Sequence, residues 1–219
     1  MSLAVIYTRA KSGINAPLVT VEVHLSNGLP SLSIVGLPEA AVKESKDRVR
    51  SALLNSHFDF PARRITINLA PADLPKEGGR FDLPIALGIL AASGQLPMES
   101  LKDYEFIGEL ALSGELRPID GILPSALACG KNDRKMLLPQ ANGAEAALAS
   151  KTTVYTAQHL LEVCAHLKEG NTLTAETLQQ ETDYTSVADI NEVIGQHQAK
   201  RALEIAAAGA HNLLSLRPI

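Results

Sequence analysis

Residues 71–84 of the chain read PADLPKEGGRFDLP, and they separate two segments with different hydrophobic patterns. Before them, residues 65–69 alternate apolar and polar side chains, which predicts a strand with one buried face. After them, residues 83–92 are rich in Ala and Leu and predict a buried helix. A glycine-rich turn between a strand and a helix often holds a functional site, because the helix N-terminus has free N–H groups. The alternative is an ordinary surface loop.

Working outward from this stretch, the pattern predicts short strands and helices on both sides. Upstream strands are expected at residues 3–8, 18–25 and 32–35, and Asn27-Gly28 predicts a hairpin between the second and the third. Downstream, a strand at 104–112 and a tight turn at Ser113-Gly114 are expected, followed by helices near 123–130, 141–149 and 157–167 and strands at 136–138 and 153–155. Hairpins followed by alternating strands and helices predict an α+β fold in which helices cover a sheet.

The segment from Pro38 to about residue 55 predicts an amphipathic helix with Pro38 in its first position. Val42, Val49 and Leu53 share one face of this helix, and the opposite face is charged. Charged faces are usually solvated and crossed by ion pairs four residues apart. The pairs expected here are Glu39–Lys43 and Glu44–Arg48.

Composition favours a cytoplasmic protein with an aliphatic core. The 219 residues include four Phe, four Tyr and no Trp, and no apolar run reaches the length of a membrane span. The N-terminus lacks the basic region and the long apolar segment of a signal peptide. Cys129 and Cys164 are isolated, and the six histidines form no HxxxH or HExxH motif. Neither a disulfide framework nor a metal site is therefore expected.

The charge is unevenly distributed along the chain. Residues 1–90 hold ten Lys or Arg against eight Asp or Glu, for a balance of +2, whereas residues 91–219 hold ten against sixteen, for −6. A mildly basic N-terminal half is compatible with contacts to phosphates. The net charge of −4 gives no argument of its own for binding nucleic acid.

Two segments resemble the catalytic segments of Lon-type proteases. Residues 75–82, PKEGGRFD, are similar to the Lon motif PKDGPSAG, which carries the nucleophilic serine, and residues 107–123 are similar to the segment that ends at the catalytic lysine. Without gaps, the serine position falls on Arg80 and the lysine position on Leu123. A Ser–Lys peptidase needs a hydroxyl and an amine that accepts its proton, and neither arginine nor leucine supplies them. The resemblance implies a ribosomal protein S5 domain 2-like fold without peptidase chemistry.

The C-terminal part of the chain resembles the opening of an AAA+ ATPase module. A polar stretch at residues 169–186 has the composition of a linker, with a short helix expected near 174–180. It divides a Lon-like domain (residues 1–168) from a truncated AAA+ start (residues 187–219), where a helix is expected at 197–208 and the start of a strand at 211–214. The resemblance implies a nucleotide-base pocket at Val193, Ile194 and Gly195. The chain has no GxxxxGK[ST] motif, so ATP and Mg²⁺ are expected only with the missing part of an ATPase domain.

Taken together, these segments resemble the bacterial Mg-chelatase-like, competence-associated ComM/YifB family. The resemblance is carried by Gly36-Leu37-Pro38 and by residues 68–73, 75–82 and 206–214. It implies a hexameric, ATP-dependent branch-migration helicase that acts in recombination during natural transformation. The Lon-like domain is then a non-catalytic part of that motor.

Two functions of different class follow for this chain. The first is a non-enzymatic module that contacts branched or single-stranded DNA or assists assembly. Its candidate DNA contacts are the basic residues Lys43, Lys46, Arg50, Arg63, Arg64, Lys76 and Arg80. For Arg80 the alternative is a surface ion pair with Asp82 or Glu77. The second function is a residual serine hydrolase of Lon type, with Ser113 or Ser125 as nucleophile and Lys76 as base.

Overall fold

The computed structural model describes residues 2–169, 172–178 and 189–214. The chain forms two compact units, which divide between Gln179 and Gln180. Each unit is described by itself below.

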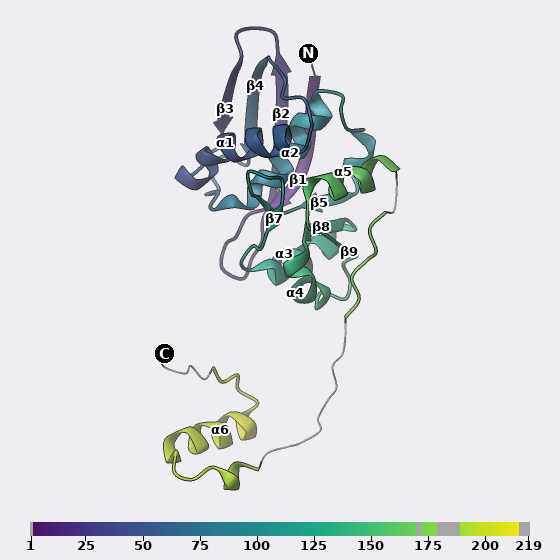
Figure 1. The fold of residues 1–219 in the computed structure, drawn as a ribbon. Helices are drawn as coiled ribbons and strands as arrows, with labels where there is room; N and C mark the ends of the chain where they lie inside the picture. The colour runs from purple at the N-terminus through teal and green to yellow at the C-terminus, as the bar shows by residue number, and fades with distance from the viewer. Residues whose placement is uncertain (1, 170–171, 179–188, 215–219) are drawn as a thin grey trace. The chain divides into compact units, whose positions relative to one another are not determined.

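The first unit is built on a seven-stranded sheet with the order β3-β4-β2-β1-β5-β8-β9 (Figure 1). Its strands are β1 (Ser2–Arg9), β2 (Leu18–Ser26), β3 (Ser31–Val35), β4 (Arg64–Ala70), β5 (Tyr104–Phe106), β8 (Lys135–Pro139) and β9 (Val154–Ala157). The pairs β3–β4, β1–β5, β5–β8 and β8–β9 are parallel, whereas β1–β2 and β2–β4 are antiparallel. A separate two-stranded sheet joins β6 (Glu109–Leu110) to β7 (Leu116–Arg117). The predicted combination of a sheet and covering helices is confirmed, as a mixed α/β arrangement.

The predicted hairpin at Asn27-Gly28 is wrong, because β4 lies between β2 and β3. In the register of the sheet, Ile67 of β4 faces Val23 of β2 on one side and Ile34 of β3 on the other. The alternating pattern of β4 therefore gives both strands an apolar partner. A local turn signal does not reveal that a distant strand lies between its two arms.

The predicted strand at residues 104–112 is interrupted at Gly108. The Gly108 N–H donates to the carbonyl of Arg80 over 3.1 Å, and the Gly108 carbonyl accepts the N–H of Leu83 over 3.0 Å. These bonds join the chain to the start of α2 instead of to the neighbouring strand. Consequently β5 ends at Phe106 and β6 begins afresh in the small sheet.

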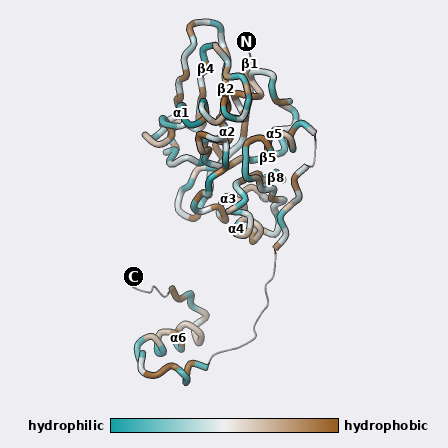
Figure 2. Tube along the Cα trace, in the orientation of Figure 1, coloured by the Kyte–Doolittle hydropathy of each residue, from teal (hydrophilic) through white to brown (hydrophobic). Residues whose placement is uncertain are grey.

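Helix α2 (Asp82–Ala92) is the central helix, and every one of its residues is buried. This confirms the buried helix predicted after the glycine-rich stretch. Gly88 lets the helix lie close to the sheet, because a Cβ at this position would lie only 2.5 Å from Cγ2 of Val23. The brown segments of Figure 2 mark the hydrophobic residues that α2 and the central strands contribute to this core.

Helix α1 (Ala40–Asn55) packs against α2 through its apolar face. Val42, Val49 and Leu53 are all buried, as predicted. The helix begins two residues after Pro38, because Glu39 is its N-cap and has an extended backbone. Of the predicted ion pairs, Glu44–Arg48 is present with an N–O distance of 3.7 Å. Glu39–Lys43 is not among the ion pairs of the described residues.

The β8 and β9 strands are covered on both faces. Met136, Leu138 and Val154 pack in one cluster with α3 (Ile122–Cys129) and α4 (Gly143–Ala147). The intervening Leu137 packs in the main core, together with α5 (Leu160–Glu169). All three helices were predicted, and α4 is shorter than expected. Short 3-10 turns lie at η1 (Gly79–Phe81), η2 (Glu99–Leu101), η3 (Gly130–Asn132) and η4 (Gln140–Asn142).

Residues 172–178, where part of a short helix was predicted, are not helical. The N–H of Glu176 donates to the carbonyl of Val154 over 2.8 Å, and Ala175 bridges to Tyr155 of β9. The segment therefore follows the edge of the sheet, where β9 still has free backbone groups. Residues 179 and 180 of the predicted helix lie outside the described residues.

The second unit contains η5 (Ile190–Glu192) and α6 (His197–Gly209). The helix confirms the prediction for residues 197–208. The predicted strand start at 211–214 is not a strand, and the N–H of His211 instead donates to the carbonyl of Ala206 at the end of α6. Across the described parts of both units, no helix combines the length and the apolar character that crossing a membrane requires.

Candidate functional site

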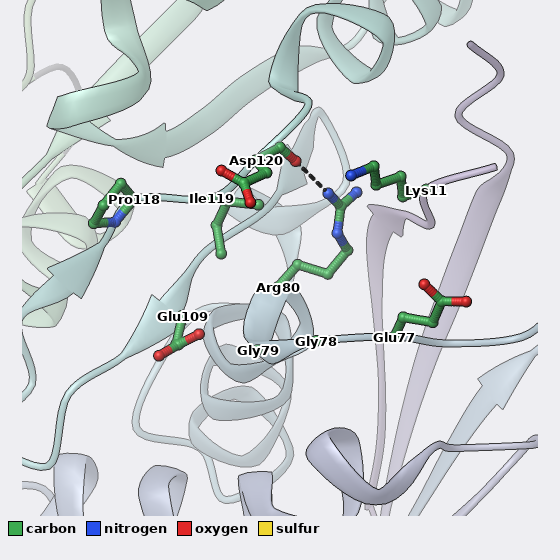
Figure 3. Close-up of a pocket in the computed structure, with 9 residues that line it drawn as sticks. All are labelled: Lys11, Glu77, Gly78, Gly79, Arg80, Glu109, Pro118, Ile119 and Asp120. Atoms are coloured by element: carbon green, nitrogen blue, oxygen red, sulfur yellow. Dashed lines mark hydrogen bonds between the residues drawn. The ribbon is translucent and has the colours of Figure 1, made fainter. Parts of the chain in front are cut away.

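A polar cavity of about 310 Å³ lies beside Arg80, the residue on which the Lon resemblance places the catalytic serine (Figure 3). Its floor is the glycine-rich turn that enters α2, and its opposite wall is the segment after β7. The residues that line it are Lys11, Glu77, Gly78, Gly79, Arg80, Glu109, Pro118, Ile119 and Asp120.

Arg80 is buried in the wall of this cavity, with only 4% of its surface exposed. Its guanidinium donates from Nη2 to the carbonyl of Asp120 over 2.8 Å and from Nη1 to the carbonyl of Arg9 over 3.4 Å. Asp82, one expected partner, instead accepts from Nε of Arg48 over 2.7 Å and from the Ser45 hydroxyl. The expected surface ion pair is therefore not found among the described residues, and the burial of Arg80 leaves little of its side chain available for the expected contact with DNA.

The structure does not assemble the alternative hydrolase at this cavity. Ser113, Ser125 and Lys76 are all absent from its lining. Lys76 is fully buried, donates to the carbonyl of Pro71, and has its pKa lowered by burial. Ser125 is buried in α3, and its hydroxyl has no hydrogen-bond partner among the described residues. Leu123 lies in the first turn of α3, where its backbone N–H donates to Glu145.

Three of the predicted DNA contacts, Lys46, Arg50 and Arg63, meet at a groove that we call the basic groove. This groove of about 410 Å³ runs between α1, the start of β3 and the loop before β4. Phe60 lies in the same wall, and the guanidinium carbon of Arg50 is 4.6 Å from the centre of its ring. The full lining is Pro30, Ser31, Leu32, Lys46, Asp47, Arg50, Phe60, Pro61, Ala62 and Arg63. Three cations against the single carboxylate of Asp47 make the groove electropositive.

The other predicted contacts do not join this groove. Lys43 is exposed on α1 but outside the lining, and Lys76 and Arg80 are buried. Arg64, the first residue of β4, does not line the groove although its neighbour Arg63 does.

Sequence reasoning missed Phe60 and Lys11. Phe60 stands three residues before Arg63, so its closeness to two arginines in the sequence was a usable signal. Lys11 comes to the cavity from the end of β1, and no local pattern connects it to Arg80.

The residues expected at a nucleotide-base pocket lie between η5 and α6. Val193 is 46% exposed and Ile194 is 97% exposed, and Gly195 has a φ of +74°. Within residues 2–169, 172–178 and 189–214, no group of three or more His, Cys, Asp or Glu side chains could hold a metal ion.

Comparison with known proteins places the chain in a family. The family described as subunit ChlI of Mg-chelatase matches residues 21–142, more than half of the chain, and a second match to the magnesium chelatase ChlI subunit covers residues 189–218. The chain belongs to the Mg-chelatase ChlI family.

Individual proteins are similar to this chain over all or most of its length. The competence protein ComM of Haemophilus influenzae is 55% identical over all of this chain and 44% of its own length. The YifB protein of Salmonella typhimurium is 54% identical over all of this chain and 43% of its own length. A Lon protease of Syntrophomonas wolfei is 26% identical over 82% of this chain and 23% of its own length. The chain thus spans less than half the length of the ComM and YifB relatives.

Proposed function

We propose that this chain is the non-catalytic N-terminal module of a ComM-like AAA+ ATPase and that its basic groove contacts DNA. In this proposal the first unit has the Lon-like, ribosomal protein S5 domain 2-like fold. The motor is a cytoplasmic hexamer that drives branch migration with ATP and Mg²⁺, which bind to an ATPase domain with a phosphate-binding loop. Similarity to ComM supports a competence-associated role, and the weak similarity to Lon supports the fold.

The convergence of Lys46, Arg50 and Arg63 around one groove is the observation that carries DNA contact. Such cations neutralise phosphates without reading bases. Arg50 lies over the ring of Phe60, and a guanidinium plane is a surface on which unpaired bases can stack, which favours single-stranded segments of a branched junction. Because the whole chain has a net charge of −4, the contact is expected to be weak and strongly dependent on salt.

The first prediction concerns Arg50→Gln/Arg63→Gln. Binding of a fluorescein-labelled branched DNA with single-stranded arms is measured by anisotropy at several salt concentrations. The double variant should weaken binding and make the slope of log K against log salt shallower, by about 0.7 for each single-strand phosphate contact removed.

A matched control removes the same charge elsewhere. Lys131→Gln/Lys151→Gln changes two exposed lysines at another surface hollow, and it should leave most of the affinity intact. Absence of binding by the wild-type chain at low salt, or equal losses in the two double variants, would overturn the proposal and favour a role in assembly.

A further inference from the structure

The cavity at Arg80 has a charge arrangement that the proposed DNA contact does not use. Two cationic side chains, Arg80 and Lys11, line it together, and in Figure 3 the ammonium end of Lys11 is turned toward the Arg80 guanidinium. Among the residues that the structure describes, no carboxylate oxygen lies within 4.0 Å of a side-chain nitrogen of either residue. Two neighbouring cations without a carboxylate partner form an unusual wall for a cavity.

Burial makes this lack of a partner energetically significant. Arg80 is 4% exposed, and its pKa is lowered by desolvation, although Asp120 and Glu77 at longer range act to raise it. Two backbone carbonyls accept hydrogen bonds from its Nη atoms, whereas Nε has no acceptor among the described residues. A buried guanidinium held only by neutral acceptors keeps a large desolvation cost, which a bound anion would offset.

The remaining lining indicates which anion fits. Glu77, Glu109 and Asp120 also line the cavity, so its carboxylates outnumber its cations. Glu109 lies 3.6 Å from Arg117, but Glu77 and Asp120 have no such partner among the described ion pairs. These negative charges repel a dianionic phosphate or a polyanionic nucleic acid. A single carboxylate placed between Arg80 and Lys11 gains both attractive contacts with less repulsion, and the planar guanidinium matches its geometry.

We propose that this cavity is a binding site for a carboxylate, received between Arg80 and Lys11. The volume of about 310 Å³ is in the range of small-ligand pockets and admits a residue-sized group attached to the carboxylate. The source is a small acid, an acidic side chain or the C-terminal end of a peptide. The cavity shares no lining residue with the basic groove. A failure of this proposal would therefore not contradict the proposed DNA contact, and a failure of the DNA contact would not contradict this proposal.

The second prediction tests this site by NMR on the ¹⁵N-labelled chain. N-acetylglycine should shift the backbone amides of Gly78 and Gly79 and the Nε–H of Arg80, with a dissociation constant on the order of millimolar, because so small a ligand makes few contacts. N-acetylglycinamide has the same shape without the charge and should cause no such shifts. Inorganic phosphate should bind less tightly than N-acetylglycine.

Variants separate the cavity from general charge effects. Lys11→Ala changes an exposed side chain and should weaken N-acetylglycine binding by about threefold to fivefold, whereas the control Lys131→Ala should not weaken it. Arg80→Gln should abolish binding; if that variant does not fold, Lys11→Ala alone decides. N-acetyl-aspartate amide, which carries only a side-chain carboxylate, distinguishes an acidic side chain from a chain end according to which probe binds more tightly.

Four results would each overturn the proposal. The first two are an absence of shifts at about 50 mM N-acetylglycine, which is well above the expected millimolar range, and equal shifts from N-acetylglycinamide. The other two are tighter binding of phosphate than of N-acetylglycine and an affinity that Lys11→Ala leaves unchanged.

Discussion

Asp82, at the start of α2, is one of the buried charged residues of the first unit. It is fully buried and accepts hydrogen bonds from Arg48, from the Ser45 hydroxyl and from the N–H of Leu110. These contacts tie α1, α2 and β6 together behind the glycine-rich turn. Sequence proximity suggested Arg80 as the partner, but the actual cation comes from 34 residues earlier in the chain.

The third prediction is that Asp82→Asn destabilises the chain by about 2–4 kcal/mol. The change removes the buried carboxylate that Arg48 contacts at 2.7 Å, although the Arg48 side chain is 21% exposed and keeps its longer contact with Glu44. The free energy of unfolding is measured by urea denaturation. Glu99→Gln breaks an exposed pair with Lys102 and is the control, with an expected change below about 1 kcal/mol. Equal stabilities of the two variants would show that the buried pair adds nothing.

At the residue scale, the sequence shows which side chains are present, but it does not show which residues they contact. Replacement of the Lon dyad residues by Arg80 and Leu123 could be seen at once, because it concerns side-chain identity at aligned positions. The burial of Arg80 and its closeness to Lys11 could not be seen, since they result from β1 and the segment after β7 meeting at the turn.

At the scale of elements, the segment 172–178 is held to α5 by a hydrogen bond that depends on a histidine. His166 on α5 is buried and accepts the backbone N–H of Leu173 at Nδ1 over 3.1 Å. Because Nδ1 is an acceptor, the proton of the neutral ring is on Nε2, which faces the hydroxyl of Tyr104 at 3.0 Å. Tyr155 packs on the ring, and Lys135 is the nearby cation. In a protonated His166, Nδ1 carries a hydrogen and can no longer accept the N–H of Leu173.

The fourth prediction is that acid loosens this segment. Desolvation, and then the charge of Lys135, lower the pKa of His166 from its usual 6.5. As the pH falls through 6.5, the unfolded chain binds a proton that the folded chain still resists, so the free energy of unfolding decreases and then levels off below the folded pKa. Urea denaturation between pH 7.5 and 5 measures this, and hydrogen exchange reports on the amides of Leu173 and Glu176.

His166→Gln is the comparison, because it retains a hydrogen-bonding side chain that does not titrate. Its stability should vary less with pH than that of the wild type. A pH dependence identical in the two proteins would contradict a role for His166, whatever the other histidines contribute.

Elements with a strong pattern of their own were predicted correctly from the sequence, whereas those defined by a distant neighbour were not. The alternation in β4 and the apolar run of α2 identify a strand and a buried helix without other information. The place of β3 beside β4, and the path of residues 172–178 along β9, depend on which sheet edges are free. Edge pairing is a property of the assembled sheet, so local composition predicted a hairpin and a linker helix instead.

At the scale of the whole chain, the basic groove and the cavity at Arg80 are two separate surfaces of the first unit, and they differ in charge. The groove carries three cations and one carboxylate, and the cavity carries two cations and three carboxylates. A polyanion is attracted to the first and repelled by the second. Under the two proposals, the module contacts DNA at the groove and a carboxylate of a protein or small molecule at the cavity.

The second unit differs from the first in having no buried residue in its helix α6. Leu203 and Ile205 are 48% and 52% exposed, and Leu203 lines an apolar hollow of about 230 Å³ with Ala199, Ala202, Leu213 and Leu214. Helices of this length are marginal in water without packing of an apolar face. Residues 189–218 match the family described as magnesium chelatase, subunit ChlI.

The fifth prediction is that the amides of α6 exchange much faster than those of β2 when the chain is dilute. Exchange from a helix without buried contacts needs only local opening, whereas the β2 amides exchange through opening of the whole sheet. Hydrogen exchange with mass spectrometry is measured at several protein concentrations, with sedimentation to record the oligomeric state. If the exposed leucines associate, protection of α6 should rise with concentration, and Leu203→Gln/Leu213→Gln should remove that rise. Strong protection of α6 in a dilute monomer would contradict this account, because none of the α6 residues is buried.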